Sequence, residues 1–195
     1  YWKIMNPSKE TASGMRWKKL GRIFDPRRHQ LPNNCLEFAQ APQALVFDDI
    51  VRIYFSTREK DKIGKYKSHV SFVDMGMDLK SILGVCNHTV IELGNLGCFD
   101  EHGIFPMNVL KDRDRILGYV GGWSRRVSVS VETSIGLAIS EDKGLTFKRI
   151  GNGPVLTSSL NEPFLVGDPF VAIFGSKYHM WYIFGVRWPN YPNED

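Results

Sequence analysis

Cysteine and histidine are scarce in this sequence, and the few that it has are dispersed. The three cysteines, Cys35, Cys86 and Cys98, are odd in number, and their spacing matches no zinc knuckle. The five histidines show no H-x-x-x-H spacing. A disulfide scaffold and transition-metal chemistry are both disfavoured, and free thiols in a reducing compartment are expected.

Long apolar runs and clustered charge are also missing. No apolar stretch approaches the roughly 20 residues of a membrane-spanning helix, and no charged-then-apolar leader follows Tyr1. The net charge is only +4, and the adjacent basic residues form short pairs such as Lys18-Lys19, Arg27-Arg28 and Arg125-Arg126. We therefore expect a cytoplasmic protein with no nucleic-acid or membrane partner; a leader upstream of Tyr1 stays an alternative.

Helical periodicity is absent almost everywhere, and a repeat takes its place. Three prolines, Pro42, Pro106 and Pro169, lie 64 and 63 residues apart. Each is followed by an apolar strand, a polar turn and a second, aromatic-rich strand, which is typical of a β-hairpin. The first strands of these pairs are predicted to start near residues 39, 103 and 166.

Further strands follow the first two hairpins. Third strands are predicted from Ser68 and from Ser134, and short outer strands follow each of them; the segment from Trp17 to Pro26 has the same outer-strand pattern. Four-stranded units in tandem are the blades of a β-propeller. The prediction is an all-β partial propeller domain over residues 1–195, an incomplete ring of about three blades; a two-sheet sandwich is the alternative.

The third unit lacks its outer strands in this sequence. An unpaired strand edge is prone to association. We therefore expect that the chain self-associates through this edge or that the protein continues beyond Asp195.

Acidic residues precede the repeated prolines of two units, at the predicted mouth of the propeller funnel. Asp168 directly precedes Pro169, Glu162 lies just upstream, and Asp100 and Glu101 precede Pro106. Glycosidic-bond chemistry needs two carboxyl groups roughly 5 to 9.5 Å apart. These four acids are the candidate catalytic residues, and Asp168 and Glu101 are expected to face a common pocket. Each of the four alone also fits a polar loop or a turn.

Aromatic and basic side chains are predicted near the same end of the ring. Tryptophan stacks on sugar rings, and arginine binds hydroxyls, carboxylates or phosphates. Packing between blades is the alternative role for Trp123 in particular. The candidate substrate-binding residues are Gln40, Arg58, His102, Trp123, Arg125 and Arg126.

The segment Ser140–Phe147, with the sequence SEDKGLTF, resembles the Asp-box of sialidases and related propellers. In that motif the Ser and the Asp stabilise a hairpin turn remote from the active site. The resemblance implies a structural role here and supports the propeller prediction.

The segments FDEHGIFP and VGDP, together with the repeated strand pairs, resemble the five-bladed β-propeller glycoside hydrolases. That superfamily includes arabinanases, xylosidases, fructosidases and mannoside phosphorylases, and the resemblance extends from about Trp17 to Trp188. It implies a glycoside hydrolase or phosphorylase acting on an oligosaccharide or glycoside, with Asp168-Pro169 as the Asp-Pro element.

The first unit departs from the pattern of these enzymes, because Gln40 and Ala41 stand where an Asp is expected. A different base such as Glu37, phosphorolysis, or loss of activity each fits that departure. A non-catalytic carbohydrate-binding or scaffold propeller is therefore the alternative function. No cofactor is expected, apart from a structural Ca²⁺ that oxygen ligands in the channel would suit.

Overall fold

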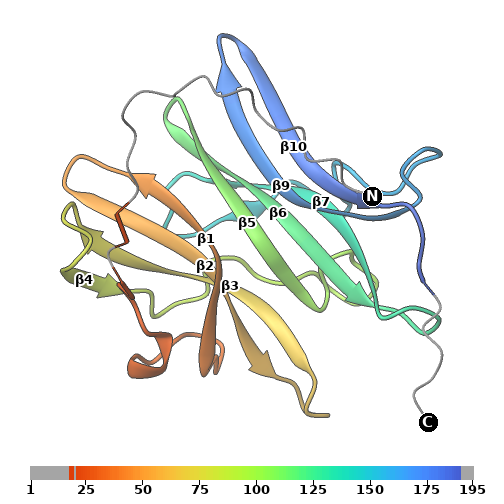
Figure 1. Ribbon diagram of the computed structural model, residues 1–195, viewed down its shortest axis with the longest axis horizontal. Helices are drawn as coiled ribbons and strands as arrows, with labels where there is room; N and C mark the ends of the chain where they lie inside the picture. Colours follow the sequence, from red (N-terminus) through yellow and green to blue (C-terminus); the bar gives the residue numbers. More distant parts are fainter. Residues whose placement is uncertain (1–17, 20, 190–195) are drawn as a thin grey trace.

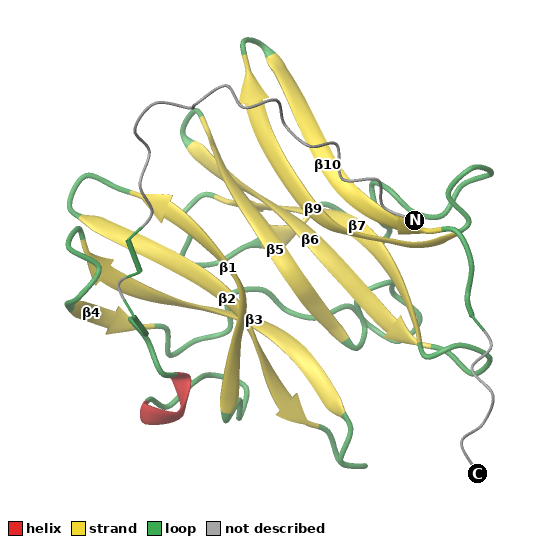
Figure 2. Cartoon of the chain, in the orientation of Figure 1, coloured by secondary structure: helices red, strands yellow, loops and turns green. Residues whose placement is uncertain are grey.

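The computed structural model describes residues 18–19 and 21–189, and strands make up nearly all of its regular structure. The first four strands are β1 (Glu37–Val46), β2 (Ile50–Lys60), β3 (Tyr66–Gly76) and β4 (Ile82–Val85). The next four are β5 (Gly103–Asp112), β6 (Arg115–Arg125), β7 (Val131–Ser140) and β8 (Lys148–Arg149). The last two are β9 (Phe164–Phe174) and β10 (Lys177–Gly185), and one short 3₁₀-helix, η1, spans Pro26–Arg28. Figure 2 shows how little helix the described chain contains.

The strands form two complete blades and the inner half of a third. Within each blade, neighbouring strands are antiparallel and follow the order of the chain. Between the two complete blades, the ladder consists of one parallel bridge, Ser68 to Gly103. Figure 1 shows the three units side by side, with β1, β5 and β9 as their first strands. The predicted incomplete β-propeller is confirmed, and the two-sheet sandwich is wrong.

The repeat predicted the first strands of the units closely. β1 starts at Glu37, β5 at Gly103 and β9 at Phe164, each within two residues of its predicted start. β2 and β3 are largely buried along their lengths. Middle strands of a blade are covered on both faces, so their Val, Ile, Phe and Tyr residues suit these positions.

Each first strand carries an irregularity next to its repeated proline. The ladder register shifts between Gln40 and Gln43 in β1 and between Ile104 and Met107 in β5. In β9 it shifts again beside Gly167, and Asp168 has a φ of 50°. A bulge re-aims the side chains around it, so the residue before each proline leaves the alternation of its strand.

Buried polar contacts join the three units at their inner strands. Asn108 of β5 is almost fully buried and donates to Oε1 of Gln43 in β1 at 3.1 Å. Its own oxygen accepts the backbone N–H of Val171 in β9 at 2.9 Å. One side chain therefore fixes the register of three neighbouring blades, because a buried amide must satisfy both of its ends.

The Asp-box forms as its sequence implies. Asp142 accepts hydrogen bonds from the hydroxyl groups of Ser140 and Thr146, each at 2.6 Å. The turn also docks on the first blade, because Tyr54 donates its buried hydroxyl to the carbonyl of Gly144 at 2.7 Å. The predicted structural role is supported by these contacts.

The segment before the first blade differs from its prediction. Trp17 and Leu20 lie outside the described residues, and the described residues from Lys18 to Asp25 form no strand. The outer strand of the first blade is β4, which pairs with β3. Ile23 and Phe24 instead pack their side chains against a cluster that includes Phe55 and Met75. The apolar residues that suggested an outer strand are explained by this side-chain packing, and the segment forms no strand hydrogen bonds.

The third unit leaves many apolar side chains exposed on both of its strands. Phe170 and Trp181 are each 52% exposed, and Ile183 is 57% exposed. The predicted self-association through this unit stays a prediction. None of the described residues forms a helix long and apolar enough to cross a membrane.

Candidate functional site

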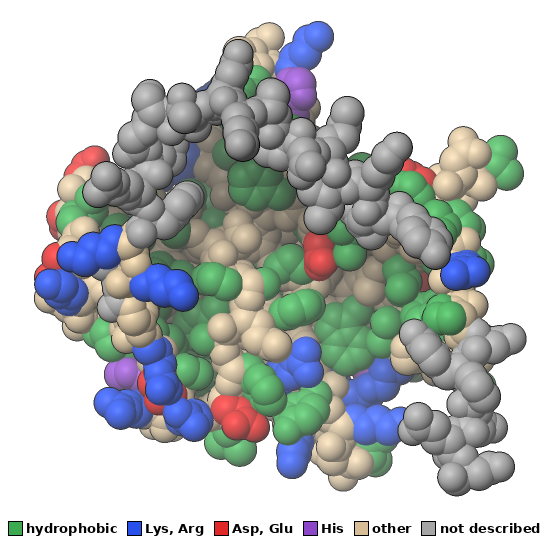
Figure 3. All heavy atoms as spheres, in the orientation of Figure 1, with side chains coloured by type: hydrophobic (Ala, Val, Ile, Leu, Met, Phe, Trp, Pro, Cys, Tyr) green, Lys and Arg blue, Asp and Glu red, His purple; other side chains and the backbone are tan. Residues whose placement is uncertain are grey.

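All three units contribute to one hollow of about 390 Å³, which we call the three-blade hollow. It lies where the second strands of the hairpins end and the first strands begin, which is the end predicted for the site. Figure 3 shows hydrophobic side chains gathered over the middle of the face that it displays. The hollow is lined by Arg58, Tyr66, Ser68, Phe105, Trp123, Val131, Thr133, Leu165, Gly167, Asp168 and Ile183. Mostly apolar walls with a few polar groups are typical of small-molecule sites.

Asp168 supplies the carboxyl group of this hollow. Its side chain forms no hydrogen bond or ion pair with any described residue, and partial burial raises its pKa. Its left-handed backbone, with φ at 50°, is a conformation that Asp tolerates better than most residues. Such strain is concentrated at functional positions, and a raised pKa suits an acid that must keep its proton.

Arg58 enters the hollow from the end of β2, among aromatic rings. Its guanidinium carbon lies 5.4 Å from the ring centre of Phe38 and 5.9 Å from those of Tyr66 and Phe105. The Nε atom of Arg58 is buried and has no hydrogen-bond partner in the described part of the chain. Arg58, a candidate substrate-binding residue, therefore lines the hollow with a hydrogen-bond donor that no described residue uses.

Trp123 forms part of the wall between the first two blades. Its indole stacks on the ring of His102, with centroids 6.0 Å apart and planes at 27°. A Cβ atom on Gly103 would collide with the indole nitrogen and lie 2.7 Å from the backbone nitrogen of Ser68. Gly103 therefore permits the close approach of Trp123 to the first blade, so Trp123 both packs between the blades and lines the three-blade hollow.

Glu101 lines a different, neighbouring hollow, which we call the loop-side hollow. Arg125 and Arg126 line it as well, and its volume is about 660 Å³. Oε2 of Glu101 accepts the backbone N–H of Gly97 at 2.8 Å, and Oε1 lies 3.4 Å from Nδ1 of His102. The expectation that Asp168 and Glu101 face one pocket is therefore wrong for the described residues, since each of the two acids lines a separate hollow.

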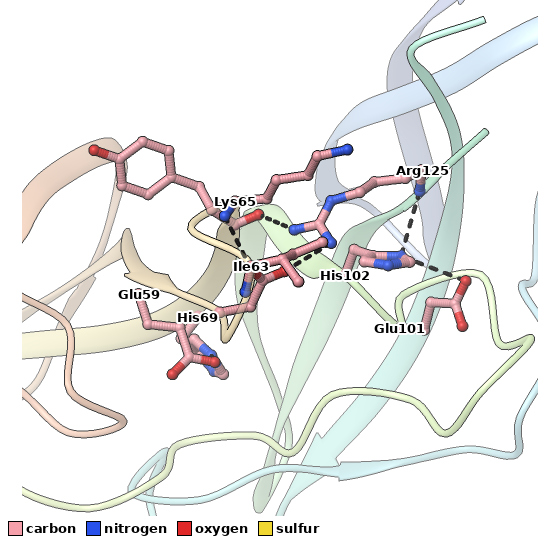
Figure 4. Close-up of polar contacts among 9 residues, drawn as sticks. Glu59, Ile63, Lys65, His69, Glu101, His102 and Arg125 are labelled. Carbon is pink, nitrogen blue, oxygen red and sulfur yellow. Dashed lines mark hydrogen bonds and ion pairs between the residues drawn. The ribbon is translucent and has the colours of Figure 1, made fainter. Parts of the chain in front are cut away.

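Arg125 is tied to the first blade. It donates to Asp61 at 2.9 Å and to the carbonyl of Tyr66 at 2.6 Å, and Arg126 pairs with Glu132. Figure 4 shows His102 between the backbone of Arg125 and the carboxylate of Glu101. Both arginines therefore have partners within the fold, and neither of these two candidate substrate-binding residues lines the three-blade hollow.

The surroundings of His102 at this junction favour its neutral form. Burial lowers the pKa of His102, and the nearby Arg125 lowers it further. Nδ1 then accepts the backbone N–H of Arg125 at 3.3 Å. The ring of His102 stacks on the indole of Trp123 and so holds the orientation of that indole.

Asp100 is a correction to the predicted catalytic set. Its side chain is fully buried, and both of its oxygens accept hydrogen bonds from Nη1 of Arg149 at 2.8 and 2.9 Å. Burial raises the pKa of Asp100, and Arg149 offsets only part of that rise. A carboxylate enclosed with its own cation cannot meet a substrate, so its role is to anchor the loop before β5 to β8.

Glu162 and Gln40 also lie away from the three-blade hollow. Glu162 accepts the hydroxyl of Tyr182 at 2.6 Å, within the third unit. Gln40 sits on the bulge of β1 with Oε1 buried and no partner among the described residues. Neither residue lines the hollow, because distance from the proline in sequence does not fix where a side chain of an irregular segment points.

Tyr66, Ser68 and Phe105 are among the residues of the hollow that sequence reasoning missed. Ser68 and Tyr66 sit at the start of β3, and Ser68 is only 1% exposed with no partner for its hydroxyl among the described residues. Strand pairing could have identified Tyr66 and Ser68, because the start of the third strand of a blade lies beside the end of its second strand, where Arg58 was predicted. Phe105 precedes Pro106, at the position that Asp168 occupies before Pro169.

No group of three or more His, Cys, Asp or Glu side chains among residues 18–19 and 21–189 has the geometry to hold a metal ion. The calcium ion suggested for the channel stays a prediction.

The sequence resembles an uncharacterized protein of Mycobacterium tuberculosis, present in strains CDC 1551 and H37Rv. The identity is 33% over 181 residues, which is 89% of this chain and 56% of the relative. The chain therefore spans about half the length of the curated relatives it matches. No protein-family profile matches it.

Solved structures with a similar fold include carbohydrate-active enzymes. A family 117 glycoside hydrolase of Zobellia galactanivorans superposes with a TM-score of 0.52, at 19% identity over 77% of this chain and 44% of its own. The protein BT0996, solved as an RGII complex, gives 0.62, at 16% identity over 85% and 53%. Sucrose-6-phosphate hydrolase of Lactobacillus gasseri gives 0.59, at 12% identity over 80% and 29%. At these identities the likeness shows the fold.

Proposed function

We propose that this chain is a carbohydrate-active protein of the five-bladed β-propeller glycoside hydrolase type, binding an oligosaccharide or glycoside in the three-blade hollow. The position of Asp168 carries the proposal. A carboxyl group without a partner among the described residues, on a left-handed bulge, faces a hollow walled by Tyr66, Phe105 and Trp123. Aromatic faces for stacking on a sugar ring and a carboxyl group for protonating the leaving oxygen are two parts of a sugar-cleaving site, and a second carboxyl group completes it.

Asp168 acts as the proton donor in this proposal. Its raised pKa keeps the proton on the carboxyl group to higher pH than for an ordinary Asp, which favours protonation of a leaving oxygen. Glu101 is the candidate for the second carboxyl group, from the loop-side hollow beyond Trp123. Phosphorolysis, in which phosphate takes the place of water, needs Asp168 alone.

The names of similar folds support the same class of activity. They include a family 117 glycoside hydrolase and a sucrose-6-phosphate hydrolase. The charged groups at the opposite, hairpin-turn end of the blades are a weaker candidate site, because Arg52 pairs with Asp74 and Arg115 with Asp112 there.

A non-catalytic sugar-binding propeller is the second candidate function. One observation favours it: Asp168 is the only carboxylate that lines the three-blade hollow in the described chain. A hollow with a single acid can hold a sugar through its rings and donors without cleaving it.

Turnover of a panel of aryl glycosides, with and without phosphate, tests the proposal. Asp168→Asn keeps the shape of the side chain and tolerates the left-handed backbone. It should lower turnover by about two orders of magnitude or more, the usual contribution of a positioned acid. Glu101→Gln should do the same if Glu101 is the second carboxylate.

Asp114→Asn and Glu141→Gln are the matched controls, since both residues are exposed and lie in turns. Both variants should keep wild-type rates. Wild-type rates in Asp168→Asn would remove Asp168 from the chemistry. Absence of turnover, together with sugar binding that Trp123→Ala weakens, would establish the binding function instead.

A further inference from the structure

Arg58 differs from the other partly or fully buried arginines of the described blades, because no described acid forms an ion pair with it. Arg52, Arg125 and Arg149 each form an ion pair with an aspartate at 2.7 to 2.9 Å. Arg58 forms none with a described residue, and its Nε is buried without a hydrogen bond. Three aromatic rings surround its guanidinium instead. Guanidinium groups that are partly removed from water normally have an anionic partner.

The acids nearest to Arg58 in the chain and in the sheet do not supply that partner. Glu37 lies opposite Arg58 in the β1–β2 ladder, but the two form no ion pair. Glu59 is bound to His69 at 3.0 Å. Asp168 lines the same hollow, but it forms no ion pair with Arg58 in the described chain.

Ser68 adds a second unsatisfied group at the same place. Arg58 and Ser68 are direct partners in the β2–β3 ladder, so their side chains share one face of the sheet about 5 Å apart. Ser68 is 1% exposed, and its buried hydroxyl has no partner among the described residues. Both residues line the three-blade hollow. Buried polar atoms without a protein partner are uncommon and point to a ligand.

We propose that Arg58 and Ser68 form an anion subsite in the three-blade hollow. It takes the carboxylate or the phosphate group of a sugar ligand, whose ring lies against the aromatic walls. The planar guanidinium offers two parallel N–H groups to such an anion, and the Ser68 hydroxyl donates a third hydrogen bond. The sugar part of this ligand depends on the proposed function, whereas the anion part does not.

Binding of matched neutral and anionic ligands, measured by calorimetry, tests the subsite. The probes are galactose, galacturonate, galactose 6-phosphate and inorganic phosphate. At least one anionic sugar should bind about tenfold or more tightly than galactose. Arg58→Gln should remove that preference and leave galactose binding unchanged. Arg58→Lys should retain part of it, because the charge remains but the two-pronged donor is lost.

Two further variants sharpen the test. Ser68→Ala should weaken the anionic sugar several-fold and leave galactose unchanged. Arg115→Gln, which removes an exposed arginine paired with Asp112 at the hairpin-turn end of the blades, should change neither affinity. Circular dichroism of each variant verifies that the fold is retained.

The probes also separate the two sources of the anion. Preference for galacturonate identifies a sugar acid, and preference for galactose 6-phosphate or for phosphate identifies a phosphoryl group. Equal affinity for neutral and anionic sugars, a preference that survives Arg58→Gln, or no binding of any anion would overturn the subsite. Neutral sugar binding without anion preference would leave the proposed function standing. Phosphate binding that depends on Arg58, without any sugar binding, would leave only the subsite.

Discussion

Two aspartates at the same end of the propeller differ in burial and in partners, since Asp100 is fully buried and Asp168 is open to solvent. Asp100, in the loop before β5, and Asp168, on the bulge of β9, both have a pKa raised by burial. Asp100 is enclosed with Arg149, whereas Asp168 faces a hollow and has no partner in the described chain. A perturbed pKa alone therefore does not identify a functional residue, because ion-pair networks of the fold produce the same shift.

The same comparison applies to the basic residues of this end. Arg125 joins the second blade to Asp61 and to the Tyr66 carbonyl of the first. Arg58 lies one blade away, and its buried Nε has no hydrogen-bond partner among the described residues. Arg125 therefore holds two blades together, whereas Arg58 and Ser68 bring unpartnered polar atoms to the three-blade hollow.

The largest expected effect separates the two aspartates by stability. Asp100→Asn leaves the buried Arg149 without its counter-charge and should lower the free energy of unfolding by about 3–5 kcal/mol. Asp168→Asn removes no contact with a described residue and should change it by less than about 0.5 kcal/mol. Urea unfolding followed by tryptophan fluorescence measures both. Equal losses of unfolding free energy in the two variants would mean that Asp100 is no more important for the fold than Asp168.

Asp142 of the Asp-box should give an intermediate effect, with a defined pH dependence. Partial burial by itself would raise the pKa of Asp142, but hydrogen bonds from Ser140 and Thr146 outweigh it and lower the pKa to about 2. A lowered pKa stabilises the fold above the ordinary value of 3.8, and this contribution is lost as the pH falls from there toward 2. Asp142→Asn should therefore lower the free energy of unfolding at pH 7 by about 1–2 kcal/mol.

Unfolding of the wild type and of Asp142→Asn between pH 2 and pH 7 measures this contribution. The two curves should converge at the acidic end, where the wild-type carboxylate has taken up its proton. Glycoside turnover should stay unchanged in the variant, since the box lies at the hairpin-turn end of the blades. A constant difference at all pH values would show that the hydrogen bonds do not depend on the charge of Asp142.

The blades were predictable from sequence because their signals are local and repeated. The prolines and the alternation of apolar residues fixed the starts of β1, β5 and β9 within two residues. The site was only half predictable. Asp168, Arg58 and Trp123 line one hollow at the predicted end of the blades, and their roles in it stay predictions.

The other site residues depend on contacts between segments that are distant in sequence. Asp100 was misassigned because its partner, Arg149, lies in β8 and no local pattern links the two. The hollow that Glu101 lines was not predictable, because the loop from Gly94 to His102 turns its side chain toward Gly97. Ser68 was missed because nothing in its own sequence marks a buried hydroxyl as unpaired.

The smallest expected effect concerns the titration of Asp168 itself. Its pKa is raised in the folded protein above the ordinary 3.8. The folded state therefore holds this proton more tightly than the unfolded state, so the contribution of Asp168 to stability is present below pH 3.8 and is lost as the pH rises through the folded pKa. This dependence is opposite in sign to that of Asp142. Asp168→Asn should remove it, and the variant should gain stability relative to the wild type as the pH rises from about 3 to 7.

Carboxyl carbon shifts in NMR spectra of the ¹³C-labelled protein measure the titration directly, with the Asp168→Asn spectrum assigning the signal. The midpoint for Asp168 should lie above that for exposed aspartates such as Asp114. A midpoint at or below their value would mean that a cation or a set of donors faces Asp168 in solution. Arg58, across the same hollow, would then be the first candidate. If the Arg58→Gln variant restored the raised midpoint, the two residues would pair with each other, and the hollow would lose the unpaired charges on which its proposed ligand depends.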